Sequence, residues 1–357
     1  MKEQVYSHRL GAITDRQFQA ALDRFQMGRL LHAEPIPFGL FGQNVFISST
    51  QGDYVLRGRP HFAWQFPTEQ FYARFLREHA NAPAPWPYQI DPGTDIFGWS
   101  YVLMPRMPGL QLADPQIREQ IQLIDRQAIA TALGENLADM QQAKWLIAGR
   151  YHAATDTVEP FELTRELAWP FPIESDPQLV AMRRTQISYS HRVKACLVHL
   201  LTKAHAANPA TTTQADLNWV QGYLNETEKA LNDTFMPCLV LEDYKRENLV
   251  VVHESSGWKV SGVFDLMGAY FGDGEADLSR QYAVYLDEDP RLAHAFLQGY
   301  LRKTTLQPGF VKRFPVYMLL DRAIIWEFLQ RHEPTQRDKS QTFRDWASLY
   351  ISPYAGS

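Results

Sequence analysis

The pattern of apolar and polar positions divides the chain into a part rich in strands and a longer part rich in helices. Between residues 35 and 103, short apolar runs alternate with turn residues, which predicts mostly strands with one amphipathic helix around 68–79. Beyond about residue 112, apolar residues recur at spacings of three and four, which predicts helices. The clearest helical stretches are 128–145, 193–205 and 217–231. This order of elements predicts an α+β fold.

Two segments stand apart from this division. An amphipathic helix is expected to begin after Thr14, whose hydroxyl suits an N-cap, and to end near Gly28. Residues 146–190 interrupt the helical pattern and contain Pro170 and Pro172. We interpret this second segment as an insertion into the helical part.

The strongest chemical signal is a polar loop between two apolar runs, residues 237–241 and 249–252. The loop begins at Asp243, ends at Asn248 and carries Lys245 between them. A carboxylate in such a loop can hold an attacking hydroxyl, an amide five positions later can bind a magnesium ion, and the ammonium group can meet a transferred phosphoryl group. A solvated hairpin turn has similar residues, so the interpretation depends on agreement elsewhere.

Two further patterns agree with phosphoryl transfer. Residues 258–264 carry apolar side chains at alternating positions and end at Asp265, which is a natural second metal ligand. Far upstream, a glycine-bearing turn at 39–47 opens a strand that is expected to pair with 54–57. Glycines let backbone amides approach phosphate oxygens closely, although any antiparallel hairpin needs such turns.

Residues 239–278 resemble the catalytic core of the aminoglycoside phosphotransferase family, the small-molecule branch of the protein-kinase-like superfamily. Asp243 and Asn248 keep the family's D-x-x-x-x-N spacing. Leu241 and Glu242 stand where the family usually has His and Gly. An inactive nucleotide-binding homologue that acts as a regulator or scaffold is therefore the alternative to an active enzyme.

The segment after the loop extends this resemblance. Asp265, the pair 272–273 and the pair 277–278 resemble the family pattern D-x-x-x-x-x-x-G-D-x-x-x-D-L. The resemblance implies a two-lobed protein-kinase-like fold, with Asp243 as the catalytic base and with Asn248 and Asp265 as the Mg²⁺ ligands. The short distance from Asp265 to residues 272–273 leaves no room for a long activation segment, which disfavours a true protein kinase.

The resemblance also indicates which residues hold ATP. Gly42 and Asn44 belong to the turn expected at the phosphates, and Arg57 takes the place of the family's phosphate-binding lysine. The carboxylate partner of Arg57 is expected to be Glu69, with Glu78 as the rival choice. An ordinary surface role is the alternative for either carboxylate.

An apolar strand pattern then stops at two prolines, which resembles the hinge of kinase-like folds. Adenine is expected to be held there by Met104, by the carbonyl group of Pro105 and by the amide of Met107, since a proline keeps its carbonyl. The hinge divides the chain into an N-terminal nucleotide-binding lobe, 1–105, and a C-terminal catalytic and substrate-binding lobe, 106–357. An edge strand that enters a proline-bounded linker gives the same pattern.

Composition narrows the remaining possibilities. The chain has 357 residues, 45% of them hydrophobic, and a net charge of −5, which disfavours nucleic acid as a partner. Cys196 and Cys238 are too few for a disulfide framework and are expected to be reduced core residues. Residues 1–8 lack the apolar core of a signal peptide, and no apolar run is long enough to span a membrane. We therefore expect a cytoplasmic protein that does not contact membranes.

The acceptor substrate is expected to be a small molecule with a hydroxyl group, such as a sugar, an aminoglycoside, a choline-like alcohol or a macrolide. The insertion at 146–190 and the helices near the C terminus are expected to shape its pocket. Acidic residues at 287–289 suggest a cationic substrate, or simply a solvated loop. Aromatic residues in these regions either line the acceptor pocket or pack in the core, and packing is the stronger expectation. They are Trp169, Phe171, Tyr189, Tyr270, Tyr282, Tyr285 and Trp326.

Overall fold

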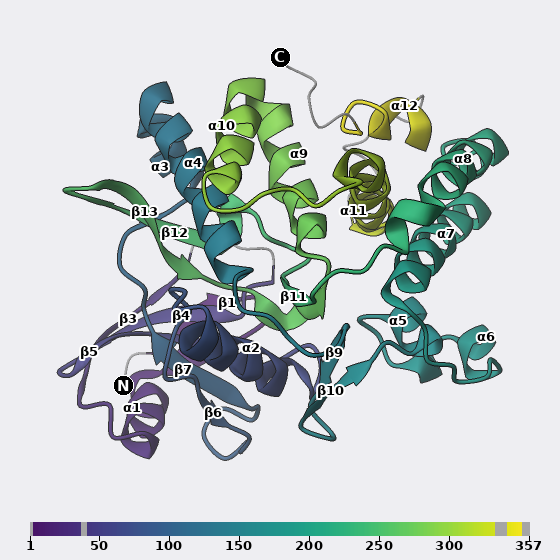
Figure 1. The fold of residues 1–357 in the computed structure, drawn as a ribbon. Helices are drawn as coiled ribbons and strands as arrows, with labels where there is room; N and C mark the ends of the chain where they lie inside the picture. Colours follow the sequence, from purple (N-terminus) through teal and green to yellow (C-terminus); the bar gives the residue numbers. More distant parts are fainter. Residues whose placement is uncertain (1–2, 37–40, 333–340, 352–357) are drawn as a thin grey trace. The chain divides into compact units, whose positions relative to one another are not determined.

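A computed structural model describes residues 3–36, 41–332 and 341–351 of the chain (Figure 1). The chain forms two compact units. The first contains residues 1–136, 152–157 and 246–267. The second contains residues 137–151, 158–245 and 268–357. The functional lobes expected on either side of residue 105 are a different division of the chain, and they stay a prediction.

The first unit is built on a five-stranded antiparallel sheet in the order β3-β4-β5-β7-β6. Its strands are β3 Leu30–Pro35, β4 Asn44–Ser49, β5 Gly52–Gly58, β6 Gln89–Asp91 and β7 Tyr101–Pro105. In β4 every second side chain is buried, as in a strand with one face toward a core. The predicted strand-rich region is therefore confirmed for the described residues. Gly39 and Leu40 of the predicted glycine turn lie outside the described residues.

Two helices of the first unit, α1 and α2, come before and between the strands of this sheet in the sequence. The hairpin of β1 Glu3–Ser7 and β2 Gly11–Thr14 leads into α1 Asp15–Arg24. Thr14 and Gln17 form a reciprocal capping box at the start of α1, which confirms the predicted N-cap. The helix expected at 68–79 is α2 Gln65–His79, and it begins three residues earlier.

The first unit also contains a second, three-stranded sheet. The hairpin of β12 Leu249–Glu254 and β13 Gly257–Val263 pairs with the short strand β8 Leu110–Gln111. Beside it, α3 Pro115–Gln120 leads into α4 Leu123–Met140, which continues into the second unit. The indole of Trp258 on β13 donates a hydrogen bond to Asp125 of α4 at 2.9 Å.

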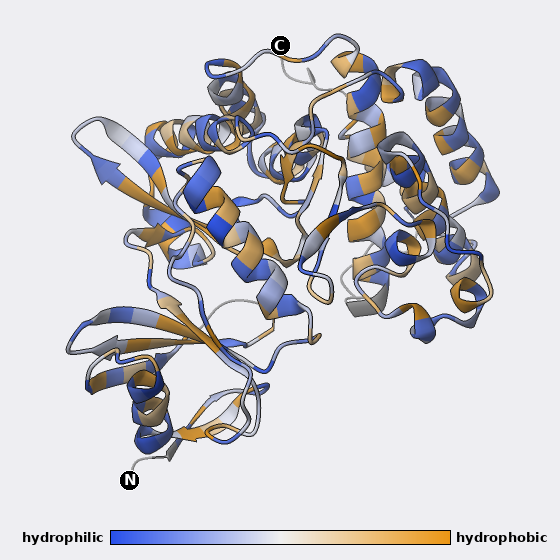
Figure 2. Cartoon of the chain, turned by 60° about the horizontal axis from the view of Figure 1, so that its bottom comes forward, coloured by the Kyte–Doolittle hydropathy of each residue, from blue (hydrophilic) through white to orange (hydrophobic). Residues whose placement is uncertain are grey.

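The second unit is mostly helical. It contains a four-stranded sheet in the order β10-β9-β14-β11, from β9 Gly149–His152, β10 Thr157–Pro160, β11 Cys238–Val240 and β14 Tyr270–Gly272. Its α-helices are α5 Leu163–Ala168, α6 Pro177–Val180, α7 Tyr189–Ala207, α8 Gln214–Leu231, α9 Leu278–Glu288, α10 Pro290–Leu301, α11 Phe310–His332 and α12 Phe343–Ala347. Many helices carry hydrophobic and hydrophilic bands side by side, as covering helices should (Figure 2). Among the described residues, no helix is long and apolar enough to cross a membrane.

Two predicted helices in this half of the chain match α7 and α8 closely, whereas the helix expected at 128–145 ends early. It is α4 Leu123–Met140, and Trp145 instead donates its backbone amide to the carbonyl of Pro237 at 2.8 Å. Trp145 also stacks on Phe271 with ring centroids 4.6 Å apart. A contact between distant parts of the chain therefore ends the periodic stretch. The interruption expected at 146–190 contains β9, β10 and the short helices α5 and α6.

Most of the aromatic side chains suggested for an acceptor pocket are buried in the core of the second unit. They are Tyr189, Tyr270, Tyr282, Tyr285 and Trp326. Phe171, by contrast, is 46% exposed. Cys196 and Cys238 are free and buried, as expected.

Candidate active site

In the first unit, an arginine whose side chain is only 11% exposed brings two carboxylates together. Arg57 lies on β5, in register with Asn44 of β4 and Val102 of β7. One guanidinium nitrogen, Nη2, lies 3.0 Å from Oε1 of Glu69 on α2 and 3.5 Å from Oδ1 of Asp265. The rival candidate Glu78 is exposed to solvent. The structure thus joins three of the residues singled out in the sequence.

Neighbouring groups fix both members of the Arg57–Glu69 pair. Gln65 donates a hydrogen bond to Oε1 of Glu69 at 3.0 Å, and the hydroxyl of Tyr88 donates to Oε2. Burial disfavours the charge of Arg57, but the Glu69 and Asp265 carboxylates outweigh burial and raise the pKa of the guanidinium above its ordinary value. Arg57 is therefore a fixed positive charge.

Asn248 and Asp265 meet at the same end of the β12–β13 hairpin. Leu249 pairs with Val263, and the amide of Phe264 donates to the carbonyl of Asn248 at 3.0 Å. The two candidate ligands therefore leave the hairpin from neighbouring positions. Asp265 has φ of 60°, in the left-handed region that costs a residue with a Cβ free energy.

These two side chains fit a magnesium ion by the chemistry of their donor atoms. An amide oxygen and a carboxylate oxygen are hard ligands, and Mg²⁺ in such sites usually takes its remaining ligands from waters and substrate phosphates. The side chain of Asp265 is 31% exposed, so it is accessible to such an ion. The described residues contain no group of three or more His, Cys, Asp and Glu side chains able to hold a metal.

The described part of the glycine turn is held against the N-terminal hairpin. Gly42 has φ of 57°, and Ser7 donates a hydrogen bond from its hydroxyl to the Gly42 carbonyl at 2.5 Å. The buried side chain of Gln43 donates to the carbonyl of Arg59 at 3.0 Å. Asn44 opens β4 directly afterwards, opposite Arg57. Hydrogen bonds and strand pairing therefore hold the backbone at Gly42 and Asn44 in place.

The predicted hinge follows β7. Met104 is buried and pairs with Val55, while Pro105 pairs with Tyr54 at the end of the strand. Met107 packs against β13: a Cβ built on Gly262 would lie only 2.8 Å from the Met107 Cβ. Close packing at a glycine therefore links the segment after the hinge to the hairpin that carries Asn248 and Asp265.

In the second unit, Asp243 lies between two cations. Lys245 Nζ is 2.7 Å from its Oδ2, and Arg280 Nε is 3.6 Å from its Oδ1. Arg280 comes from α9, is buried, and also pairs with Asp321 of α11 at 2.6 Å. Asp243 and Lys245 keep 30% and 28% of their side chains exposed. The carboxylate is thus oriented by the protein and open to a reactant.

Arg280 and Asp321 were not predicted from the sequence. Each is a charged residue within a mostly buried helix, and the only local signal is that Arg280 lies three positions after Asp277. Asp277 has a role of its own, because its carboxylate accepts the backbone amides of Leu241 at 2.5 Å and Glu242 at 2.8 Å. Burial raises the pKa of Asp277 to about 7.

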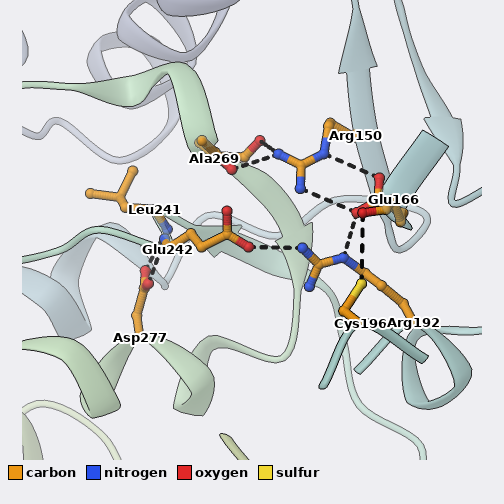
Figure 3. A network of polar contacts seen from close by, with 9 residues as sticks. Arg150, Glu166, Arg192, Cys196, Leu241, Glu242, Ala269 and Asp277 are labelled. Atoms are coloured by element: carbon orange, nitrogen blue, oxygen red, sulfur yellow. Dashed lines mark hydrogen bonds and ion pairs between the residues drawn. The ribbon is translucent and has the colours of Figure 1, made fainter. Parts of the chain in front are cut away.

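Glu242 is joined to a buried network of charges in the second unit (Figure 3). Its carboxylate accepts a hydrogen bond from Arg192 of α7 at 2.8 Å, and Arg192 also contacts Glu166 of α5 at 2.7 Å. Arg150 of β9 lies 3.2 Å from both oxygens of Glu166. In the sequence, Glu242 stands out only as a departure from the family motif, and no local pattern marks the other three residues as its partners.

The sheet-based first unit and the helical second unit together define a protein-kinase-like fold, like that of aminoglycoside phosphotransferases. The sequence profile of the phosphotransferase enzyme family matches residues 32–310, well over half of the chain. The protein therefore belongs to the phosphotransferase enzyme family. The resemblance and the fold predicted from the sequence are both confirmed. No curated protein matches the chain significantly by sequence.

Solved structures show the same fold at low sequence identity. A thermostable variant of aminoglycoside phosphotransferase APH(4)-Ia, in ternary complex with ADP and hygromycin B, has a TM-score of 0.57 and 14% identity, over 95% of this chain and 98% of that one. A proposed fructosamine-3-kinase of Haemophilus somnus 129PT has a TM-score of 0.59 and 13% identity, over 93% and 97%. The GDP and kanamycin complex of APH(2")-IIIa has a TM-score of 0.53 and 14% identity, over 95% and 96%.

Proposed function

We propose that this protein is a kinase that transfers the γ-phosphoryl group of ATP to a hydroxyl group of a small molecule. The observation that carries the proposal is the setting of Asp243, a partly exposed carboxylate held between Lys245 and Arg280 in a loop with the family spacing. Residues 1–105 would form the nucleotide-binding lobe and residues 106–357 the catalytic and acceptor lobe. A cytoplasmic location fits the need for ATP.

In the proposed reaction, Asp243 accepts the proton of the acceptor hydroxyl as the oxygen attacks the γ-phosphorus. The new bond joins the acceptor oxygen to phosphorus, the bond to the β-phosphate oxygen breaks, and ADP leaves. Lys245 lies 2.7 Å from Asp243, where its ammonium group can offset charge on the transferring group. Arg280 keeps the Oδ1 side of the carboxylate fixed.

The residues of the first unit would hold the nucleotide. Arg57, kept charged and in place by Glu69, would contact the phosphates. Gly42 and Asn44 would place backbone groups near the phosphates, and the hinge residues Met104, Pro105 and Met107 would hold adenine. Asn248 and Asp265 would hold Mg²⁺, which would neutralise phosphate charge when it is bound.

The direct test is transfer from [γ-³²P]ATP to a panel of acceptors that includes aminoglycosides, fructosamines, sugars, choline-like alcohols and macrolides. ADP and GDP complexes are both known among the structural neighbours, so GTP is tested as a second donor. We expect one class of acceptor to be phosphorylated, and we expect Asp243→Asn to reduce kcat by about 10²-fold or more while nucleotide affinity is kept. If no acceptor is phosphorylated, and wild type and Asp243→Asn bind nucleotide equally, the protein is an inactive regulator and the proposal fails.

A further inference from the structure

Glu242, which immediately precedes the proposed catalytic base, has an unusual backbone conformation. Its φ is 68°, in the left-handed region that glycine occupies readily and that other residues adopt at a cost. The family usually has glycine at this position, and a glycine adopts such a φ readily. The unusual feature of this chain is therefore that a glutamate side chain stands there. A non-glycine residue persists in this conformation only when its surroundings hold it there.

Two contacts hold Glu242 from opposite ends. Asp277 accepts its backbone amide at 2.8 Å, and Arg192 donates to its carboxylate at 2.8 Å. The first contact is to the main chain and needs no particular side chain at position 242. The second contact exists only because this residue is a glutamate.

Arg192 is itself immobilised. It is 3% exposed, its Nε donates to Glu166 at 2.7 Å, and its guanidinium lies 4.0 Å from the ring centroid of Tyr270. Glu166 is shared with Arg150, which also donates to the carbonyl of Gly268 at 2.6 Å. The partner of Glu242 is therefore a fixed point of the second unit, because it is tied through Glu166 to β9 and to the segment before β14.

The charges of this network balance only when Glu242 is counted. Arg150 and Arg192 are buried cations, whereas Glu166 alone among the three is an anion. Glu242 supplies the second negative charge although its side chain is 21% exposed and could turn toward solvent. Since a buried guanidinium without a compensating anion is costly, the network retains the Glu242 carboxylate, and with it the peptide that leads into Asp243.

We propose that Arg192 and Glu242 form a positioning pair that sets the orientation of the Asp243 carboxylate. Neither residue touches a reactant, so the pair acts through the backbone between positions 242 and 243. The catalytic consequence rests on the proposed role of Asp243, whereas the structural consequence, a rigid loop at 241–245, does not.

The pair is tested with Arg192→Met, Glu242→Gln and the double variant, and with Arg192→Lys as the conservative change. We expect each single change to reduce kcat by about 10- to 100-fold with the KM for ATP unchanged, because displacing a catalytic group by about 1 Å costs rate rather than nucleotide binding. The double variant is expected to be no slower than the slower single variant, because both remove one interaction. Arg192→Lys, which keeps the charge, is expected to recover part of the rate.

Lys194→Met is the matched control, because Lys194 lies on the same helix and pairs at 3.0 Å with Glu228, whose side chain is 66% exposed. It is expected to leave kcat unchanged. Amide hydrogen exchange gives a second readout that needs no acceptor. Arg192→Met and Glu242→Gln should raise exchange in the peptide that covers 239–245, with little change in α8.

Any of three results would overturn the positioning pair. Two of them are multiplicative losses of kcat in the double variant and unchanged exchange at 239–245 in both single variants. If the protein proves to have no transferase activity, the proposed function fails while the exchange result still decides whether the pair holds the loop. Exchange that rises equally throughout the second unit would indicate a general structural role and would also reject the proposal.

Discussion

Replacing Glu166 with glutamine is a strong perturbation of the buried charge network. Glu166 lies between Arg150 and Arg192, and all three side chains are at most 3% exposed. The glutamine keeps the shape and some hydrogen-bonding capacity but removes the negative charge. Two buried guanidinium groups would then share one partly exposed carboxylate, that of Glu242. We expect the free energy of unfolding to fall substantially.

The magnitude follows from the pKa of Glu166. Burial raises this pKa, but Arg150 and Arg192 outweigh burial and lower it from 4.5 to about 2. A shift of this size corresponds to about 3 to 4 kcal/mol, at about 1.4 kcal/mol for each pKa unit. Breaking a buried ion pair by removing one partner costs a similar amount, about 3 to 5 kcal/mol.

The same shift fixes the sign of the pH dependence. Because the folded-state pKa is depressed, the contribution of Glu166 is fully present above pH about 4.5 and is lost as the pH falls toward about 2. The stability difference between wild type and Glu166→Gln should therefore shrink as the pH is lowered from 6 to 3. Urea denaturation followed by tryptophan fluorescence at a series of pH values measures this difference.

Glu228→Gln is the control for this experiment. Its partner Lys194 is on the helix that carries Arg192, but the side chain of Glu228 is 66% exposed, so the expected loss is below about 1 kcal/mol. A loss below 1 kcal/mol for Glu166→Gln at pH 7 would refute the reasoning. A larger loss that stays constant between pH 6 and pH 3 would refute the assignment to an ionised Glu166.

Two further predictions concern the packing of each unit. Gly109→Ala should lower the denaturation midpoint clearly more than Gly98→Ala. Both glycines have positive φ, so the backbone strain is common to both changes. A Cβ at Gly109, however, would lie 2.3 Å from the Val251 carbonyl oxygen, whereas nothing lies within 4 Å of a Cβ at Gly98. Equal losses in urea denaturation would contradict this. Burial raises the pKa of Cys196 and Cys238 to about 12, so both thiols should react with a disulfide reagent at pH 8 only after unfolding. Rapid reaction of the native protein would show that they are not buried.

Sequence patterns predicted those parts of the fold whose cause is local. The capping box at Thr14 and the helices α7 and α8 agree with apolar spacing and end signals that lie within a few residues. The predicted end of α4 was wrong because the backbone amide of Trp145 is hydrogen-bonded to the carbonyl of Pro237, which lies 92 positions away in the chain. Periodicity contains no information about such a partner.

The candidate site likewise has features that local sequence patterns predict and features that they do not. The spacing of Asp243 and Asn248 is a local property and was visible at once, whereas the contact of Arg192 with Glu242 spans 50 positions. A single arginine within a helix has the same appearance in a sequence whether it is buried and paired or solvated. Burial and pairing of Arg192 and Arg280 therefore required the structure.

The structure also changes the significance of Leu241 and Glu242, the two departures from the family motif. The contacts of Asp277 with this turn are made to backbone amides, so they survive any side chain that the backbone tolerates at these positions. Leu241 is buried, and Glu242 has a specific partner in Arg192. Both replacements are thus accommodated by contacts within the second unit, and the turn that leads into Asp243 keeps its hydrogen bonds to Asp277. Asp243 itself keeps its contacts with Lys245 and Arg280.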